Sequence, residues 1–334
     1  MANWNDLPNE LKWMIVEEMT FETRTRLKIC SKSDKNLVET IPIYYDVLLI
    51  RSRKTDSMTD ICISLQTSKT SKLDFLLFAY VLTDGPLAGW VGVIVNNGTI
   101  DERVKRIRCS SSEEGENLIT QLFENIVFNR NLSFYCINID KTYPGFLADR
   151  EFTIRPKYAN IKGESGQVTG WLRKMAPGVE AVVLEKEEEG NNGKIEGLGT
   201  ISVVMNATIL DIDRECDVND EQLVNFNGKI VRFRGKSNIT GKGVNQLIKK
   251  AIANDYPKGS FFEVALNEVV LQTWDDIIEG LDVKVSEEEE NSDEEGEEEE
   301  VELIEKKGSI EMRRGKRMEV ELRMDNVIIT ICKD

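Results

Sequence analysis

The first 41 residues place apolar positions at helical spacing. A short loop carrying Leu7 leads into Pro8, which is tolerated in the first turn of a helix because no N–H is needed there. The following residues predict a helix with an apolar stripe at Leu11, Met14, Ile15 and Met19. Trp13 and Val16 lie off this stripe, so apolar positions cover more than half of the helix circumference. Either the rest of the protein or a partner must therefore cover the second face.

Further helical segments complete a short N-terminal unit. A second helix is expected to end near Cys30, and Ser31 or Ser33 can cap a third helix. Pro42 disfavours helix in the residue before it, so the unit is expected to span residues 1–42. An ordinary helical hairpin that packs on the domain behind it is the simpler interpretation of the same spacing.

After residue 43 the spacing changes to short segments typical of strands. Strands are predicted at Val47–Ile50, Asp60–Leu65 and Trp90–Val95, whereas the apolar run Leu73–Leu82 fits a buried strand or a buried helix. The basic segment Arg103–Arg108 resembles a nucleic-acid or nuclear-import patch, but in an acidic chain a solvated edge strand is the favoured interpretation.

From residue 110 the pattern alternates between helix and strand. Predicted helices are 112–126, 167–175, 220–226 and 243–254, and predicted strands are 132–139, 179–184, 208–212, 229–233 and 261–266. Such alternation favours parallel strands with helices packed against them. Strand starts recur every 20 to 30 residues, which is the range of leucine-rich repeats, although the repeat consensus is absent. We therefore expect residues 43–266 to form an irregular, leucine-rich-repeat-like α/β array, with a closed α/β sandwich as the alternative.

The C-terminal residues 267–334 are expected to form a β cap on this array. The alternation from Ile310 to Met324 predicts a hairpin or a three-stranded meander. The cap is interrupted at 286–300, where Glu287–Glu300 holds eleven acidic residues and no Lys or Arg. This run cannot bury apolar surface, so we expect a disordered loop. A tolerated insertion is favoured over a docking strip for a basic partner.

Composition excludes several classes of function. The chain has 334 residues, a formal net charge of -16 and no histidine, which removes the usual general base and zinc ligand. The six cysteines are scattered, so we expect neither a metal nor a disulfide framework. No apolar run approaches the roughly 20 residues of a membrane span, and an acidic chain is a poor nucleic-acid ligand. We expect no membrane partner, no nucleic-acid partner and no cofactor.

Enzymatic chemistry finds no support in the pattern. Nucleophiles lack an imidazole base, and the paired carboxylates lie mainly in the acidic run or on exposed helix faces. Gly241 and Gly243 lack the third Gly and the Lys-Ser/Thr pair of a phosphate loop. We expect a protein that is not an enzyme, and the absence of a secretory signal points to the cytoplasm, with the nucleus as a second compartment.

The residues Leu7-Pro8-Asn9-Glu10, the region of Ile15, Leu27 and Cys30-Ser31-Lys32 form a pattern in the N-terminal segment. This pattern resembles the F-box motif, as it occurs in the expanded F-box families of nematodes. In that family the three helices dock on the Skp-type linker of a cullin-RING ubiquitin ligase. The resemblance implies linker contacts at Leu7, Pro8, Leu11, Ile15 and Leu27. Ser33 stands where many F-boxes carry Trp, so a scaffold that has lost linker binding is the alternative.

A second resemblance lies in the last third of the chain. Ile239-Thr240, Asn245, Leu247-Ile248-Lys249 and Ile252 are similar to a signature of the F-box-associated domain of nematode proteins, with Ala251 in place of the usual Trp. The similarity continues at 277–281 and 310–316. Together the resemblances imply an SCF-type ubiquitin ligase adaptor for protein degradation. Its F-box would bind the Skp linker and its C-terminal domain an unknown target protein.

Overall fold

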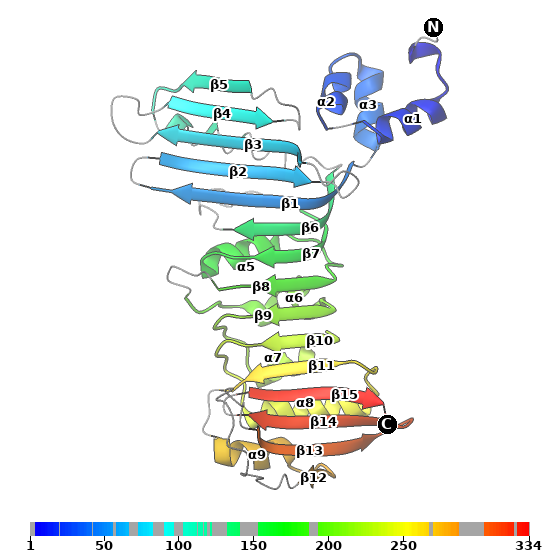
Figure 1. Ribbon diagram of the computed structural model, residues 1–334, viewed down its shortest axis with the longest axis vertical. Coiled ribbons are helices and arrows are strands. Elements are labelled where there is room, and N and C mark those ends of the chain that lie inside the picture. Colours follow the sequence, from blue (N-terminus) through cyan, green and yellow to red (C-terminus); the bar gives the residue numbers. More distant parts are fainter. Residues whose placement is uncertain are drawn as a thin grey trace, which may run out of the picture. The chain divides into compact units, whose positions relative to one another are not determined.

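The computed structural model describes most of the chain as two compact units (Figure 1). The described residues are 4–19, 21–41, 43–55, 58–66, 73–82, 90–96, 103–111, 113–115, 117–118, 121, 132–140, 153–186, 193–266, 270–286, 304–323 and 326–333. The N-terminal unit comprises residues 1–163 and 174–176, and the C-terminal unit comprises 164–173 and 177–334. The division expected from the sequence, at residues 42 and 266, stays a prediction.

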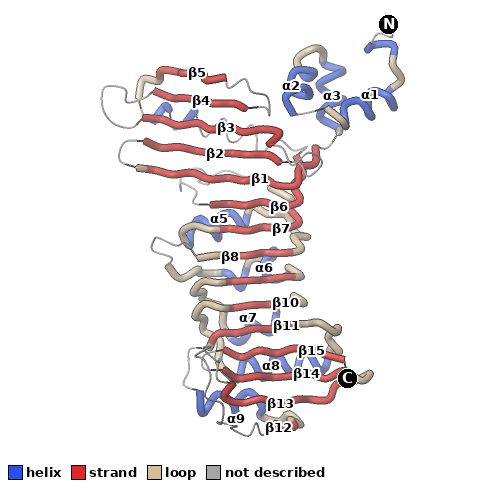
Figure 2. Tube along the Cα trace, viewed as in Figure 1, coloured by secondary structure: helices blue, strands red, loops and turns tan. Residues whose placement is uncertain are grey.

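The N-terminal unit begins with helices, followed by strands (Figure 2). A short 3-10 helix, η1 (Trp4–Asp6), precedes α1 (Asn9–Glu17), α2 (Phe21–Lys28) and α3 (Lys32–Thr40). Pro8 is the residue just before α1, one position earlier than the sequence placed it. The Ser31 hydroxyl oxygen accepts a hydrogen bond from the Asp34 backbone N–H at 3.0 Å, which identifies Ser31 as the cap of α3.

Seven described strands of this unit form one sheet. They are β1 (Ile43–Lys54), β2 (Met58–Gln66), β3 (Leu73–Leu82), β4 (Trp90–Asn96), β5 (Arg103–Arg108), β6 (Leu132–Asp140) and β7 (Pro156–Ile161). Their order is β7-β6-β1-β2-β3-β4-β5, with parallel pairing from β7 to β1 and antiparallel pairing from β1 to β5. The ambiguous segment 73–82 is therefore a strand. The basic segment 103–108 is the last strand at this end of the described sheet, as the edge interpretation predicted.

One face of this sheet is buried where β2, β3 and β4 contribute to it. Ile61, Ile63, Val81 and Val91 point to it and have no exposed surface. At Gly115, in the described fragment of the predicted helix 112–126, a Cβ would lie only 2.4 Å from the Val81 side chain. The backbone at Gly115 therefore packs directly on this face, and glycine permits the close approach.

The C-terminal unit combines parallel and antiparallel strands. Its strands are β8 (Ala181–Leu184), β9 (Ile209–Ile212), β10 (Ile230–Phe233), β11 (Phe261–Ala265), β12 (Lys284–Ser286), β13 (Ile304–Met312), β14 (Lys316–Arg323) and β15 (Asn326–Lys333). The order is β8-β9-β10-β11-β15-β14-β13-β12, parallel from β8 to β11 and antiparallel beyond. The predicted meander near the C-terminus is formed by β13, β14 and β15.

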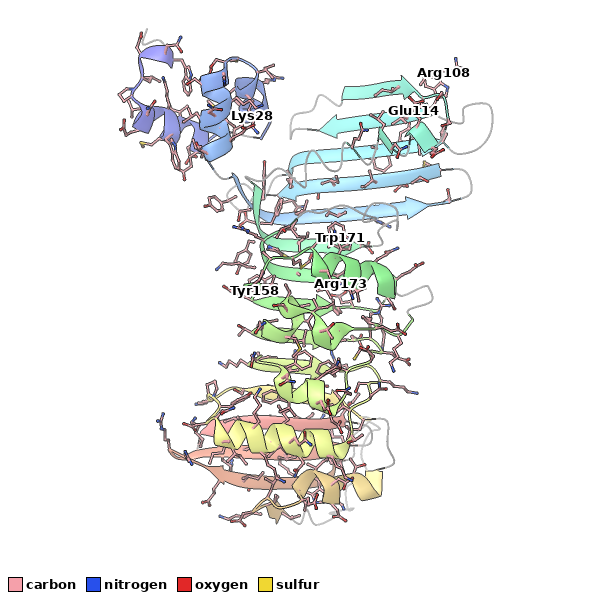
Figure 3. The ribbon with its side chains drawn as sticks, turned by 180° about the vertical axis from the view of Figure 1, so that it is seen from behind. Lys28, Arg108, Glu114, Tyr158, Trp171 and Arg173 are labelled. Carbon is pink, nitrogen blue, oxygen red and sulfur yellow. The ribbon has the colours of Figure 1, made fainter. Side chains whose placement is uncertain are left out.

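Helices of the C-terminal unit cover one face of its sheet (Figures 1 and 3). They are α5 (Ser165–Arg173), η3 (Leu198–Thr200), α6 (Ser202–Asn206), α7 (Asp220–Asn225), α8 (Gly241–Ala253) and α9 (Val270–Ile278). The fold is thus mixed α/β, with helices at the N-terminus followed by a large, mainly sheet-containing region. The comparison with leucine-rich repeats stays a prediction, and most of the acidic run 286–300 lies outside the described residues.

Local sequence accounts for how α7 and α8 meet. Asn219 and Gln222 form a reciprocal capping box at the start of α7. Asp220 then accepts hydrogen bonds from the backbone N–H and the hydroxyl of Thr240, each at 2.7 Å. A Cβ at Gly243 would lie 2.2 Å from the Asp220 carboxylate, so Gly243 allows two helices to pack closely. The Asp220 carboxylate therefore occupies the start of α8, which is the place where a phosphate-binding loop would hold its phosphate.

Candidate protein-binding site on the N-terminal helices

The three N-terminal helices enclose a small apolar core. Val16 of α1, Val38 of α3 and Ile41 are buried at its centre. Four partly buried residues pack around them: Trp4, Met19, Leu27 and Leu37. Every helix contributes to this core, which explains why a segment of about 40 residues adopts a defined arrangement.

A buried arginine joins the ends of the helices. Arg24 of α2 is 2% exposed and donates hydrogen bonds from Nη2 to the Glu17 carbonyl and from Nη1 to the Ile41 carbonyl, both at 3.0 Å. Its Nε donates to the Met19 carbonyl at 3.3 Å. Burial lowers the pKa of Arg24, although the nearby Tyr45 and Glu17 favour its charged form. The guanidinium satisfies carbonyls left without partners where α1 and α3 end.

A polar network fixes α3 against the beginning of the chain. The Trp4 indole N–H donates to Asp34 Oδ1 at 2.8 Å, and the Ser31 hydroxyl donates to Asp34 Oδ2 at 2.7 Å. The hydrogen bonds from Ser31 and Trp4 lower the pKa of Asp34. Lys28 on α2, labelled in Figure 3, lies 3.9 Å from the Glu39 carboxylate of α3.

The apolar stripe of α1 faces outward. At about 100° per residue, Met14, Leu11 and Ile15 fall within about 100° of the helix circumference. Their exposed fractions are 63%, 45% and 41%, whereas Val16, which lies off the stripe, is completely buried. Because large apolar side chains favour burial, this stripe is a surface suited to a protein partner. We call Leu11, Met14 and Ile15 the α1 stripe.

The residues predicted to bind the linker fall into two groups. Pro8, Leu11 and Ile15 are exposed along α1, and Leu7 just before the helix is half-buried. Leu27 packs against the apolar core instead of lying on the exposed stripe. The structure thus brings four of the five residues to the α1 side of the unit. Their role in linker binding stays a prediction.

Three further exposed apolar residues were not among the predicted contacts. Met14 belongs to the α1 stripe, and its helical spacing from Leu11 was a usable signal. Trp13 is 43% exposed on another side of α1, and Ile29 follows α2 with most of its surface in solvent. No periodicity marks Ile29, since it lies in the turn after the helix.

In the described segments, no three side chains of the Cys, Asp, Glu or His type are grouped to hold a metal ion. No helix among them is long and apolar enough to cross a membrane. What the N-terminal helices offer is an exposed apolar stripe on a core held by Arg24 and Asp34.

Comparison with known proteins identifies this segment. A Caenorhabditis elegans protein described as an uncharacterized F-box protein is 23% identical over 296 residues, which cover 81% of this chain and 75% of that protein. No solved structure shows a significant match. Residues 4–46 match the F-box domain family. F-box domains in general bind Skp-type linkers in SCF complexes, and their proteins are generally adaptors rather than enzymes. The helices η1 to α3 are therefore an F-box domain.

Proposed function

We propose that this protein is the substrate-recognition adaptor of an SCF-type cullin-RING ubiquitin ligase. The F-box binds the Skp-type linker, and the rest of the chain holds a target protein for ubiquitin transfer. Catalysis then comes from proximity, because the adaptor raises the local concentration of the target near the ligase. No bond-making step in this chain is required.

The exposed α1 stripe is the observation that carries the proposal. A helix that displays Leu11, Met14 and Ile15 while burying only Val16 is incomplete without a partner. The Skp-type linker is the partner that F-box domains share. Its binding would remove the stripe from water, and each fully buried apolar side chain contributes about 1.5–3 kcal/mol.

Contacts in the C-terminal unit support an F-box-associated domain as the target-binding part. Two segments that resemble signatures of that domain, residues 239–252 and 277–281, lie apart in the chain but touch here. The Asn245 side chain on α8 donates hydrogen bonds to the carbonyls of Ile277 and Glu279, at 2.7 and 3.0 Å. A buried amide with both donors used is a specific structural constraint. It links the segment around Asn245 to the segment Ile277-Ile278-Glu279-Gly280 of this chain.

Linker binding tests the adaptor proposal. Purified Skp-type linker is titrated with the wild-type chain and with the triple variant Leu11→Ser, Met14→Ser, Ile15→Ser. Because these side chains are exposed, the variant should stay folded. We expect wild-type binding to fall at least about a hundredfold, since losing three interface side chains exceeds 2.7 kcal/mol.

A matched triple variant controls for the general loss of exposed apolar surface. Ile107→Ser, Tyr135→Ser and Val285→Ser remove exposed apolar side chains that lie outside the F-box helices. This variant should bind the linker like the wild type. Equal losses in both triple variants would contradict a specific α1 interface.

The alternative function is a protein-interaction scaffold with a degenerate F-box. Ser33, exposed on α3, favours it because an apolar Trp is missing from the third helix. Failure of the folded wild-type chain to bind the linker would support the scaffold and overturn the adaptor proposal.

A further inference from the structure

Cationic side chains gather at one end of the strands of the C-terminal sheet, around the loop that joins α8 to β11. Figure 1 shows this loop at the same end of the sheet as the start of β14 and the end of β15. We call five described residues at this end the basic corner: Lys229, Lys258, Arg313, Arg314 and Lys316. Lys316 is half-buried, and the other four are exposed.

Backbone pairing brings two lysines of the basic corner together at the start of β11. The Lys229 carbonyl accepts a hydrogen bond from the Phe261 N–H at 2.9 Å. A Cβ at Gly259 would lie 3.7 Å from Lys229 Nζ, and Lys258 is the residue before Gly259. Among the described residues neither lysine has an ion-pair partner.

One carboxylate lies among these cations. Asp255, in the same loop, accepts a hydrogen bond from Lys316 Nζ at 2.6 Å, and its Oδ2 atom lies 3.6 Å from Arg314 Nη1. The hydrogen bond from Lys316 lowers the pKa of Asp255, and the charges of Arg314 and Arg313 lower it further. A single carboxylate therefore faces several positive charges, and the basic corner keeps an excess of them.

Neighbouring carboxylates do not remove this excess. The two on adjacent positions of β13 and β14 already have ion-pair partners: Glu311 with Lys284, and Glu319 with Arg317. On the open face of the same sheet Asp211 is likewise paired with Arg232. The charges of that face are balanced within the protein, whereas the end of the strands is positive in a chain of net charge -16.

Arg314 occupies a strained position in the turn between β13 and β14. Its φ is 63°, in the left-handed region that favours Gly, Asn or Asp. Its side chain is 82% exposed, so the ion pair with Asp255 contributes little to stability. An arginine that strains the turn and adds little stability points to a use of its charge outside the fold.

The spread of the cations indicates the shape of a ligand. Lys229 lies before β10 and Arg314 lies before β14, and the strand order between them is β10-β11-β15-β14. Three spacings of about 4.8 Å separate these strands, which amounts to roughly 14 Å. A single phosphate would require cations that converge on one point. A row of this length suits several carboxylates along an extended segment of about six residues.

The aromatic residue of the loop is already engaged within the protein. The half-buried Tyr256 ring packs against Phe262, with 5.9 Å between the ring centroids, and Lys250 Nζ lies 5.9 Å from its centroid. Proteins that bind single-stranded nucleic acid combine a basic groove with aromatic rings on which bases stack. Since the ring of this loop is engaged, the basic corner favours an acidic protein ligand.

We infer that the basic corner binds an acidic segment of another protein, an extended run of about six residues rich in Asp and Glu. Its carboxylates lie along Lys229, Lys258 and Arg314. Such complementarity of charge selects partners and speeds their association. Under the proposed function this segment belongs to the target protein, and for that role the inference rests on the proposed function. The binding itself does not require it.

Fluorescence anisotropy with a defined probe tests the inference. The probe is a fluorescein-labelled hexaglutamate peptide, and the protein is the full chain without linker, in about 50 mM NaCl so that screening is weak. We expect saturable binding that weakens at least about tenfold in Lys229→Glu/Lys258→Glu, because reversal of two charges replaces attraction by repulsion. Because no linker is present, failure of this test leaves the adaptor proposal intact.

Matched reagents make the result specific. Lys236→Glu/Lys242→Glu reverses two exposed charges near the opposite ends of β10 and α8 and should bind the probe like the wild type. A hexalysine probe should bind at least about tenfold more weakly than hexaglutamate. The titration is repeated on a chain with Gly and Ser in place of residues 287–300, so that the acidic run of the protein does not compete with the probe.

Arg314→Asn separates binding from folding. Asn tolerates the left-handed backbone conformation better than Arg, so the midpoint of thermal unfolding should not fall. The affinity for the probe should fall about threefold, which is typical of the loss of one exposed ion pair. A lower midpoint with unchanged affinity would show that Arg314 serves the fold, and it would contradict the inference.

Several other results would overturn the inference. One is the absence of saturable binding up to about 1 mM probe in both the wild-type chain and the chain with the replaced run. Others are unchanged affinity in Lys229→Glu/Lys258→Glu with intact circular dichroism, or equal binding of hexalysine. Tighter binding of a peptide with one phosphoserine and no acidic residue would indicate a site for a single phosphate. Tighter binding of a 12-nucleotide oligo-dT would assign the surface to single-stranded nucleic acid.

Discussion

The stripe of α1 and the helix α8 of the C-terminal unit are both amphipathic, but they place their apolar side chains in opposite environments. Leu11 and Ile15 of α1 are exposed, whereas Leu247 and Ile248 of α8 are buried beneath the C-terminal sheet. Apolar positions recur at helical spacing in both helices, although those of α1 cover more than half of its circumference. The difference lies in what covers each stripe: α8 packs on a sheet of its own unit, whereas the described core of the N-terminal helices buries the Val16 side of α1 and leaves the α1 stripe exposed.

An apolar stripe on a helix therefore indicates a binding surface only when no other part of the protein covers it. In the F-box the buried side of α1 is represented by a single residue, Val16, and the core is completed by Arg24 and Asp34. In the C-terminal unit the uncovered sheet face carries paired charges such as Asp211 and Arg232. Because these charges are paired within the protein, this face requires no binding partner to neutralise them.

The largest expected effect comes from the same substitution at the two stripes. Ile248→Ala removes a fully buried side chain and should lower the free energy of unfolding of the C-terminal unit by about 2–5 kcal/mol. Ile15→Ala should change the stability of the F-box by less than about 0.5 kcal/mol. Hydrogen exchange of the two segments measures both. Comparable losses would show that a part of this chain covers the α1 stripe.

The next effect concerns the residue that holds the F-box together. Arg24→Met removes the donors to the Glu17, Met19 and Ile41 carbonyls and should destabilise the F-box by about 2–4 kcal/mol. Limited proteolysis and hydrogen exchange of residues 4–41 detect the loss, while exchange in the C-terminal unit should not change. Lys35→Met, at an exposed position of α3, is the matched control. If hydrogen-exchange protection of residues 4–41 were the same in Arg24→Met as in the wild type, the stability of the F-box would come from its apolar core alone.

Local patterns predicted much of the fold. The cap at Ser31, one of two candidates, and the alternation of β14 are encoded by residues close together in the chain, so the sequence indicated them. The segment 73–82 was ambiguous because a strand with apolar residues on both faces loses the period of two. Pairing with β2 and β4 identifies it as a strand.

The candidate site was harder to predict because its meaning depends on distant contacts. Periodicity located the α1 stripe but could not tell whether it points inward or outward, since Val16 and the stripe are both apolar. Arg24 gave no signal at all, because its partners are carbonyl groups that any sequence supplies. The contact of Asn245 with 277–279 likewise joins segments that no local pattern connects.

A smaller effect is expected at the ion pairs of the C-terminal sheet. Asp211 accepts hydrogen bonds from Arg234 Nη2 at 2.6 Å and from Arg232 at 3.5 Å, but both guanidiniums are about two-fifths exposed. Solvent screening reduces their contribution, so Asp211→Asn should cost about 1 kcal/mol. Thermal unfolding in 1 M NaCl should remove most of that difference, because the screening length is then about 3 Å.

Lys186→Met is the matched control for this pair of measurements. Lys186 lies 3.2 Å from Asp213, and both side chains are well exposed. Its loss should have no measurable effect on stability. A salt-independent cost of Asp211→Asn would indicate that the hydrogen bonds of Asp211, and not its charge, stabilise the sheet.

The smallest effect tests the polar side of the F-box core through pH. The pKa of Asp34 is lowered by hydrogen bonds from Ser31 and Trp4, so its charged form binds these partners more strongly in the folded state. Its contribution is present above the unfolded pKa of about 3.9 and is lost as pH falls through the lower folded value. Asp34→Asn should therefore be less stable than the wild type at pH 7, by about 1 kcal/mol or less, and the difference should shrink below about pH 4.

Hydrogen exchange of the F-box at pH 7 and thermal unfolding at pH 3 compare the two proteins, with Asp6→Asn as the exposed control. A difference that persists unchanged at pH 3 would mean that the shape of the carboxyl group, not its charge, positions Trp4. The F-box would then depend on packing in the same way as the C-terminal unit. In that case the contrast between the two regions would reduce to the exposed α1 stripe, which is the feature that the proposed linker interface requires.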